Sequence, residues 1–299
     1  MKSYKAKNYT WLYFEKPAKE DLEIIQKIFQ PHPIVLGEFN SPTYRPRATR
    51  YKEYLFMVLH FPAYDKKTRT PQVGEIDILI KEDYIITSTS HHLHALYYYF
   101  NQLNKNQNNP TLKAPSSSYF CLLHIIDIMI NSNFPKLDRI SQNLKEIEKQ
   151  IFLGNEKEMV KEISIVKRDI LNFRRNIKPQ RSILESLSLD EAIKTNKEFK
   201  PRINDIIGSN IRIWNILETH KETIDSLEAT NDSLFSHKIN ETMKIIAIFQ
   251  IIFLPSTLAA GLFGSNVPMP INSYWEAFII IIILMLITSL IVKKVNWFK

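Results

Sequence analysis

Two apolar segments near the C-terminus decide the fold: residues 245–263 read IIAIFQIIFLPSTLAAGLF, and residues 274–292 read YWEAFIIIIILMLITSLIV. As helices, segments of this length span about 28 Å, which is close to the hydrocarbon thickness of a bilayer. Residues 279–287 of the second segment are apolar on every face, whereas a core helix of a soluble protein normally carries a polar stripe. The sequence therefore predicts a hairpin of two transmembrane helices.

Basic residues flank this hairpin on both sides. Residues 264–273 between the two segments contain neither lysine nor arginine, whereas lysines occupy positions 238, 244, 293, 294 and 299. Because positive residues are retained on the cytoplasmic side, we expect a multi-pass protein of the inner or plasma membrane with both termini cytoplasmic. Residues 264–273 then form an external loop, and residues 293–299 form a basic cytoplasmic tail. The N-terminus has no long apolar segment, so we expect no export of the region ahead of the hairpin.

The composition narrows the class of protein. The 299 residues leave room for one sizeable domain ahead of the hairpin. Cys121 is the single cysteine, which excludes an intrachain disulfide framework and a cysteine-rich zinc site. The net charge is +8, but the lysines are scattered among glutamates and no basic motif is interleaved with aromatic residues. We therefore expect membrane lipids as partners and no nucleic acid.

Residues 1–118 alternate strand-like and helical patterns, which predicts an α+β domain on the cytoplasmic side. Short β-branched or aromatic runs at 54–61, 76–80 and 83–88 are typical of strands, and the last two have hairpin spacing. Residues 104–118 are rich in asparagine, proline and serine, which indicates a linker or exposed loop.

Beyond residue 118 the pattern changes to long helices. The region 119–200 is predicted to be a helical cytoplasmic region with helices at about 119–154 and 156–177. The region 201–263 has no proline before Pro255 except at its first residue, so we expect one continuous helix over 202–263, about 62 residues and about 93 Å long. This helix forms a stalk that continues into the first transmembrane helix. A lone helix of this length is marginal, so we expect oligomerisation to bury its apolar stripe.

The polarity of the first transmembrane helix falls on one face. On a heptad grid this face carries Asn240, Met243, Ala247, Gln250, Leu254, Thr257, Gly261 and Gly264. Gln250 and Thr257 are costly against lipid, so they are expected to face a bundle interior or water. Two interpretations fit: hydrogen bonding between closely approaching helices, or the wall of a pore. In a closed ring of identical chains, the same face would place belts of oxygen atoms around the axis, which suit a hydrated hard cation.

Two motifs on and after this helix resemble the CorA family of divalent-cation transporters: NETMK at 240–244 and FLPSTLAAGLFGSN at 253–266. The family pattern there is approximately NEvMK followed by iFlPlTfiaGiyGMN. Weaker similarity covers most of the remaining chain, at the strand-like runs 54–62 and 78–87, at the basic segment 174–184 and at the tail 293–297. The resemblance implies a funnel-shaped homopentameric channel in which the first transmembrane helix lines the pore and the second lies outside it.

The resemblance also implies roles for single residues. Asn240, Met243, Thr257 and Gly261 match pore-facing positions of the family, as part of a pore lining that includes Ala247, Gln250 and Leu254. Gly264, Ser265 and Asn266 correspond to the family's Gly-Met-Asn selectivity filter, in which a ring of asparagines holds a hydrated ion by its waters. Asp205 aligns with an acidic residue that senses cytoplasmic Mg²⁺ at subunit interfaces, although a solvated helix charge is an equal alternative. The expected cargo is Mg²⁺, with Co²⁺ or Ni²⁺ also carried.

The chain departs from the family pattern at the filter. Ser265 replaces the methionine of the motif, and residues 266–271 lack the carboxylate that many members have there. Electrostatic concentration of cations at the pore mouth should therefore be weaker. The zinc-transporting ZntB branch also varies the middle residue, so a Zn²⁺ transporter is the second interpretation, and a non-conducting homologue is the third. His91, His92 and His94 are a weak candidate for a zinc site, with an exposed loop or helix start as the commoner explanation.

An enzyme is the weakest alternative. The sequence contains no Gly-rich phosphate loop, no G-x-S-x-G elbow and no H-E-x-x-H motif. Carboxylate pairs such as Glu146 and Glu148 lie among lysines, where a solvated charged face is the default. We expect no enzymatic activity and no catalytic residue.

Overall fold

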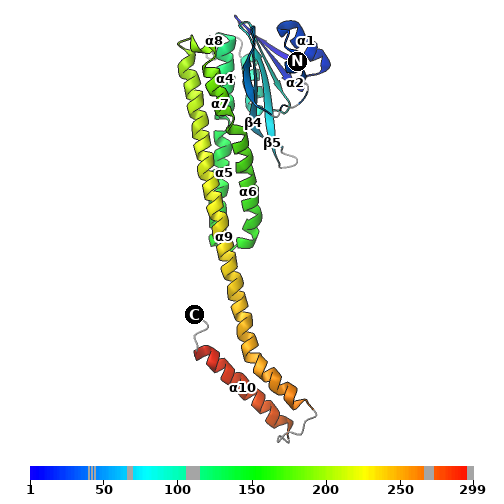
Figure 1. The fold of residues 1–299 in the computed structure, drawn as a ribbon, viewed down its shortest axis with the longest axis vertical. Helices are drawn as coiled ribbons and strands as arrows, with labels where there is room; N and C mark the ends of the chain where they lie inside the picture. The colour runs from blue at the N-terminus through cyan, green and yellow to red at the C-terminus, as the bar shows by residue number, and fades with distance from the viewer. Residues whose placement is uncertain are drawn as a thin grey trace. The chain divides into compact units, whose positions relative to one another are not determined.

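The computed structural model describes residues 1–39, 41, 43, 45–65, 70–105, 115–265 and 273–294. The chain forms two compact units, Met1–Glu228 and Ala229–Lys299. The first unit combines a β-sheet with a helical bundle, and the second contains two apolar helices (Figure 1). This arrangement confirms the predicted fold class of an α+β domain followed by long helices and a C-terminal helical hairpin.

The sheet has six strands in the order β1-β2-β6-β5-β4-β3. The β2–β6 pair is parallel, and the remaining pairs are antiparallel. The predicted strands correspond to β4, β5 and β6, while β1, β2 and β3 were not predicted. The strand bounds are β1 Lys2–Lys5, β2 Thr10–Glu15, β3 Arg47–Arg50, β4 Leu55–Asp65, β5 Thr70–Ile80 and β6 Tyr84–Thr89.

Each face of the sheet is covered by helices because each is apolar over most of its area. One face packs Phe14, Phe56 and Leu79 against the short helices α1 (Lys19–Phe29) and α2 (Pro33–Glu38), which lie on the outer side of the sheet in Figure 1. On the opposite face, the ring of Trp11 packs edge-on against Phe100 with the centroids 4.9 Å apart. Phe100 belongs to α3 (His94–Lys105), which packs beside α4 (Ser118–Asn131).

The prediction of one helix over 119–154 is wrong, because the chain breaks there into α4 and α5 (Phe134–Phe152). Pro135 stands in the first turn of α5, where its missing N–H does no harm but where it prevents α4 from continuing. The buried side chain of Asn133 fills the break by donating hydrogen bonds to the carbonyls of Met129 and Ile130, at 3.1 and 3.0 Å.

The bundle continues with α6 (Glu156–Ile177), α7 (Gln180–Ser188), α8 (Glu191–Lys194) and the long helix α9 (Phe199–Phe263). Figure 1 shows α5 and α6 running beside the first part of α9. Buried Ile213, Leu217 and Ile224 form the apolar stripe of α9 in this unit. Charged pairs flank the stripe: Arg174 lies 2.6 Å from Glu218, and Lys167 lies 2.5 Å from Glu228.

The α9 helix is continuous over 65 residues, or about 97 Å, and passes through Pro255 without a break. This result confirms the expected single helix over 202–263. Proline is tolerated in membrane-spanning helices when neighbouring groups satisfy the freed backbone.

The second unit consists of the end of α9 and α10 (Tyr274–Lys294). Both helices contain an 18-residue window apolar enough to cross a membrane, with mean hydropathies of 2.1 and 2.7. Only 11% and 6% of these windows are buried within the chain, whereas a core helix of a soluble protein would be mostly buried. Lipid or other protein chains must therefore cover them.

Candidate functional site

The polar face that the sequence predicts on α9 lies opposite α10. Six buried or half-buried positions after residue 247 form one stripe on α9: Ile248, Ile252, Pro255, Ser256, Ala259 and Phe263. The hydroxyl of Thr288 on α10 lies 3.4 Å from the carbonyl oxygen of Ile252, so this stripe faces α10. At 100° per residue, the predicted polar face is on the other side of the helix.

The residues of the polar face are accordingly exposed. Asn240, Met243, Gln250, Leu254, Thr257 and Gly261 are exposed, and Ala247 is half-buried. Leu254 is 71% exposed and Met243 is 60% exposed. A Cβ atom added at Gly261 would have no neighbour within 4 Å, so the helix surface is open there. The structure thus brings these residues together on an uncovered face, while their role as a pore lining stays a prediction.

The hydroxyl group of Thr257 on the predicted polar face bonds to the backbone of its own helix. Thr257 donates to the carbonyl of Phe253 at 2.9 Å. This bond satisfies the hydroxyl proton, while the oxygen lone pairs stay available to accept a hydrogen bond from water.

Gly264 and Ser265, the described part of the motif that is predicted to form the filter, follow the C-terminal end of α9. The amide of Gly264 donates to Ala260, and both the amide and the hydroxyl of Ser265 donate to the carbonyl of Leu262, at 3.2 and 2.7 Å. Ser265 therefore satisfies a backbone carbonyl at the helix end, which methionine could not do with its side chain. Asn266 lies outside the described residues, as do the rest of the loop up to residue 272 and the tail from residue 295.

Asp205 is exposed near the start of α9 and lines a cavity of about 350 Å³. The same cavity is lined by Asp127 and His124 of α4 and by Arg202 of α9. Burial and the nearby positive charge of Arg202 lower the pKa of His124, which therefore favours its neutral form. Two carboxylates, one neutral imidazole and one guanidinium thus surround this space, and sequence analysis identified only Asp205 among them.

Among the described residues, no group of three or more His, Cys, Asp or Glu side chains is placed to hold a metal ion. The same is true of the histidines at positions 91, 92 and 94. His92 lies 3.0 Å from Glu15, whereas His91 lies 3.0 Å from Ser90 and the ring of His94 stacks on Tyr98. The ring centroids of His92 and His94 lie 6.4 Å apart, but the described residues form no metal-holding group with them.

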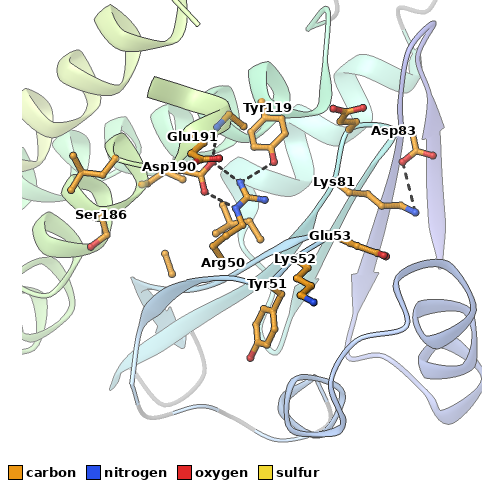
Figure 2. Close-up of a pocket in the computed structure, with 16 residues that line it drawn as sticks. Arg50, Tyr51, Lys52, Glu53, Lys81, Asp83, Tyr119, Ser186, Asp190 and Glu191 are labelled. Atoms are coloured by element: carbon orange, nitrogen blue, oxygen red, sulfur yellow. Dashed lines mark hydrogen bonds and ion pairs between the residues drawn. The ribbon is translucent and has the colours of Figure 1, made fainter. Parts of the chain in front are cut away.

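A cavity of about 1030 Å³ lies between the edge of the sheet and the α7–α8 segment (Figure 2). The guanidinium of Arg50 points toward Asp190 and Tyr119 and donates to both, at 2.7 and 2.5 Å to the two Asp190 oxygens and at 3.0 Å to the Tyr119 hydroxyl. Asp190 also caps α8 by accepting from the amide of Ala192 at 3.1 Å. These contacts join β3 to the helical bundle, so we interpret the cluster as structural.

Sequence analysis also missed a group of buried charged residues on β4 and β5. Nε2 of His60 lies 3.3 Å from Glu75, whose two carboxylate oxygens accept from the amide of Thr43 at 3.0 and 2.8 Å. Asp77, two residues after Glu75, is 4% exposed. Burial, followed by the charge of Glu75, raises the pKa of Asp77 well above 3.8. The alternation of Glu75 and Asp77 with isoleucines was visible in the sequence, but it is also typical of a solvent-facing strand.

The fold and the exposed apolar hairpin define a membrane protein with a large N-terminal α+β unit. The chain belongs to the family described as CorA-like Mg²⁺ transporter protein, which matches residues 6–298. This family consists of channels and transporters, which agrees with the expectation that the chain is not an enzyme.

Individual relatives agree with this assignment. The chain is 25% identical over 260 residues to the cobalt/magnesium transport protein CorA of Thermotoga maritima, covering 86% of this chain and 73% of the relative. It is 26% identical to the putative metal ion transporter YfjQ of Bacillus subtilis, covering 96% and 88%. It is 22% identical to the zinc transport protein ZntB of Yersinia pseudotuberculosis, covering 97% and 86%.

The fold is similar to that of a solved structure, the CorA magnesium transporter from Methanocaldococcus jannaschii. The TM-score is 0.79 and the identity 19%, with 98% of this chain and 91% of that chain covered. The likeness extends over both units, so it includes the hairpin as well as the sheet and the bundle.

A cysteine scan can test the two sides of α9. Gln250→Cys and Thr257→Cys should react with a hydrophilic thiol reagent in the membrane at least about tenfold faster than Ser256→Cys and Ile252→Cys, because ionised thiols require water. The native Cys121 is buried and should give little background. Equal rates on the two sides would remove the water-facing assignment.

The raised pKa of Asp77 on β5 can be tested through the pH dependence of the protein's stability. Because the pKa of Asp77 is raised in the folded state, its contribution is fully present below about pH 4 and is lost as the pH rises through the raised value. The steepest loss for one proton is about 1.4 kcal/mol per pH unit, and Asp77→Asn, which mimics the neutral acid, should abolish this slope. Melting temperatures of both proteins between about pH 5 and 9 check this, with exposed Asp232→Asn as the control. Parallel profiles would contradict it.

Proposed function

We propose that this protein is a divalent metal cation channel of the CorA type that takes up Mg²⁺, and also Co²⁺ or Ni²⁺, across the inner or plasma membrane. The single observation that supports a conduction pathway is the uncovered polar face of α9, which lies opposite the face packed toward α10. Gln250 and Thr257 on that face require water or polar partners at membrane depth.

A homopentamer provides this environment. Five copies of α9 with their polar faces inward would enclose water, while α10 on the outer side of each copy would face lipid. The apolar side chains that are exposed in the single chain, among them Phe249, Phe253 and Leu258, would contact lipid or the neighbouring copies. Met243 and Leu254 would narrow the pore to apolar rings that can close it by excluding water.

The ion is proposed to enter with its hydration shell. Mg²⁺ loses water reluctantly, so neutral oxygens that hydrogen-bond its waters select it better than a cage of direct ligands. A ring of Asn266 side chains beside Gly264 and Ser265 would supply these oxygens at the pore mouth. The hydroxyl of Ser265 is engaged with Leu262, so its replacement of a methionine stabilises the helix end locally and leaves Asn266 as the residue that contacts the hydrated ion.

Asp205 is proposed to bind regulatory Mg²⁺. The cavity with Asp127 and Asp205 offers two carboxylates from one chain, which is too few for a closed site. Ligands from a neighbouring copy would complete the coordination, so the bound ion would stabilise one arrangement of subunits. Arg202 in the same cavity weakens the attraction for a cation and would make this site a low-affinity sensor.

The topology follows from the charge distribution. Lysines flank the hairpin at both ends, and the loop between the helices has none, so both termini are proposed to lie in the cytoplasm. The N-terminal unit would then be exposed to cytoplasmic Mg²⁺.

A Zn²⁺ transporter is the second candidate. The similarity to the zinc transport protein ZntB extends over 97% of the chain, and the altered motif residue Ser265 weakens the inference of Mg²⁺ selectivity. A non-conducting homologue is the alternative if the altered filter no longer passes ions.

Flux measurements in liposomes separate these functions. Purified protein with Mg²⁺, Co²⁺ or Zn²⁺ outside and an ion-sensitive dye inside should give the fastest uptake for Mg²⁺. Faster uptake of Zn²⁺ would favour the second candidate. Pentamers that conduct none of the three ions would contradict the proposed function, and a monomer in mild detergent would contradict the pore.

Removing the filter amide tests the role of the loop. Asn266→Ala should reduce Mg²⁺ uptake at least about tenfold, because hydrogen bonds worth about 0.5–1.5 kcal/mol each are lost from every copy at once. Asn143→Ala, an exposed position in α5, is the matched control and should conduct normally. Size-exclusion chromatography must give the same oligomer for all three proteins. Undiminished flux in Asn266→Ala would remove the filter assignment.

A further inference from the structure

A cavity of about 420 Å³ opens between α5, α6 and the β4–β5 hairpin, and its described lining includes no residue of α9. Figure 1 shows α5 and α6 side by side, and α6 also packs against β4 and β5. The volume lies within the range of small-molecule pockets, about 300–1,000 Å³. The lining shares no residue with the predicted pore or with the cavity of Asp205.

One face of each helix lines this cavity. On α5, Lys136, Arg139 and Ile140 are three or four residues apart, which places them on the same side of the helix. The lining residues of α6 repeat with the same helical spacing: Ile165, Asp169, Asn172, Phe173 and Asn176. The space is therefore bounded by two helix faces that each combine polar or charged groups with apolar ones.

The α5 wall of the cavity is positively charged. Lys136 donates to the carbonyl oxygen of Pro62 at 2.7 Å, which uses one of the three N–H donors of its ammonium group. Burial lowers the pKa of Lys136 to about 8, so a nearby anion would stabilise its charged form. Arg139 is exposed and lies one turn further along α5. Two cations one turn apart can thus donate to the same anion.

The α6 wall contains a buried amide without a partner. Asn176 is 6% exposed, and no hydrogen bond joins its side chain to another described residue. Its polar atoms are not fully enclosed, so they are open to the cavity that Asn176 lines. Buried polar groups are normally hydrogen-bonded, and an amide left without a partner costs free energy. A ligand with hydroxyl groups would satisfy this amide, since a hydroxyl both donates and accepts.

The charges of the lining restrict the ligand further. Lys136, Arg139 and Asp169 are the charged residues of the described lining, so its net charge is positive. Arginine and lysine both bind phosphate, and the planar guanidinium can donate to two phosphate oxygens at once. Asp169, on the opposite helix, would repel a second anionic group but would accept hydrogen bonds from hydroxyl groups. The ligand should therefore be anionic at one end and neutral and hydroxylated at the other.

We propose that this cavity binds a phosphomonoester of a hydroxyl-bearing metabolite, with the phosphate at Lys136 and Arg139 and the hydroxyl groups at Asp169 and Asn176. Sugar phosphates and nucleoside monophosphates share this chemistry. Phe173, which is 5% exposed, adds an apolar wall for the ring carbons of either ligand. The site lies within the N-terminal unit of one chain, so the proposal does not depend on ion conduction.

Isothermal titration calorimetry of the full-length protein in detergent tests the proposal. The buffer contains no divalent metal, so that no metal ion can hold the phosphate. The probes are ribose 5-phosphate and adenosine 5′-monophosphate, and the matched fragments are inorganic phosphate, ribose and adenosine. At least one probe should bind once per chain, at least about tenfold more tightly than its fragments. Tighter binding of adenosine 5′-monophosphate would identify a nucleotide as the ligand, and tighter or equal binding of ribose 5-phosphate would identify a sugar phosphate.

Charge-neutral variants of α5 test the phosphate end of the site. Lys136→Gln and Arg139→Gln should each weaken binding of the probes at least about tenfold, because each removes a charge-assisted hydrogen bond. Lys136→Gln also alters the bond to Pro62, whereas Arg139 is exposed and its replacement should not affect assembly. Lys145→Gln, at an exposed position of α5 outside the cavity, is the matched control and should bind like the wild type.

Asp169→Asn distinguishes this site from a general attraction of phosphate to basic residues. The variant should lower the ratio of ribose 5-phosphate affinity to inorganic phosphate affinity by about threefold or more, because an acceptor for the hydroxyl groups is weakened. Absence of binding of both probes at millimolar concentrations would overturn the proposal. So would inorganic phosphate that binds as tightly as both probes, or unchanged affinities in every variant that assembles.

Discussion

The structure depends on one constraint: the 65-residue helix α9 must have its apolar surface covered along its whole length. In the N-terminal unit, the bundle supplies this cover through buried Ile213, Leu217 and Ile224, with ion pairs to α6 at the margins. In the second unit, α10 covers only one stripe, and both helices stay exposed over most of their apolar windows. This apolar surface is costly in water, so lipid or other protein chains must cover the hairpin.

The sequence correctly predicted the helices whose hydrophobic pattern extends over many residues. The hairpin, α6 and the continuous α9 were correct because long apolar periodicity cannot be produced by a few residues. Other elements were missed or wrongly divided. Lys2–Lys5 and Arg47–Arg50 form edge strands although they have almost no apolar residues, since pairing with β2 and β4 supplies their hydrogen bonds. The division between α4 and α5 depends on Pro135 and on a buried asparagine.

The candidate functional sites were also predicted only where a local sequence pattern indicated them. Helical phase was sufficient to place Gln250, Thr257 and Gly261 on one face, and the structure adds that this face is opposite α10. The cavity around Asp205 required α4 to be brought beside α9, which no local pattern could predict. Asp77 and Glu75 resembled ordinary solvent-facing residues of a strand. The end of α2 lines a cavity together with these two residues and the amide of Thr43 bonds to Glu75, and these are tertiary contacts that strand periodicity does not contain.

The buried acids also bear on why the N-terminal unit is more than a support for the hairpin. Replacing Asp77 and Glu75 with apolar residues would remove the cost of desolvating two carboxylates, so stability alone does not favour their presence. Glu75 fixes the backbone of Thr43 and pairs with His60, which gives it a structural role. Asp77 has no comparable bond at Oδ1 among the described residues. Burial and then the charge of Glu75 raise the pKa of Asp77, so the protonation states of these two neighbouring carboxyl groups depend on each other.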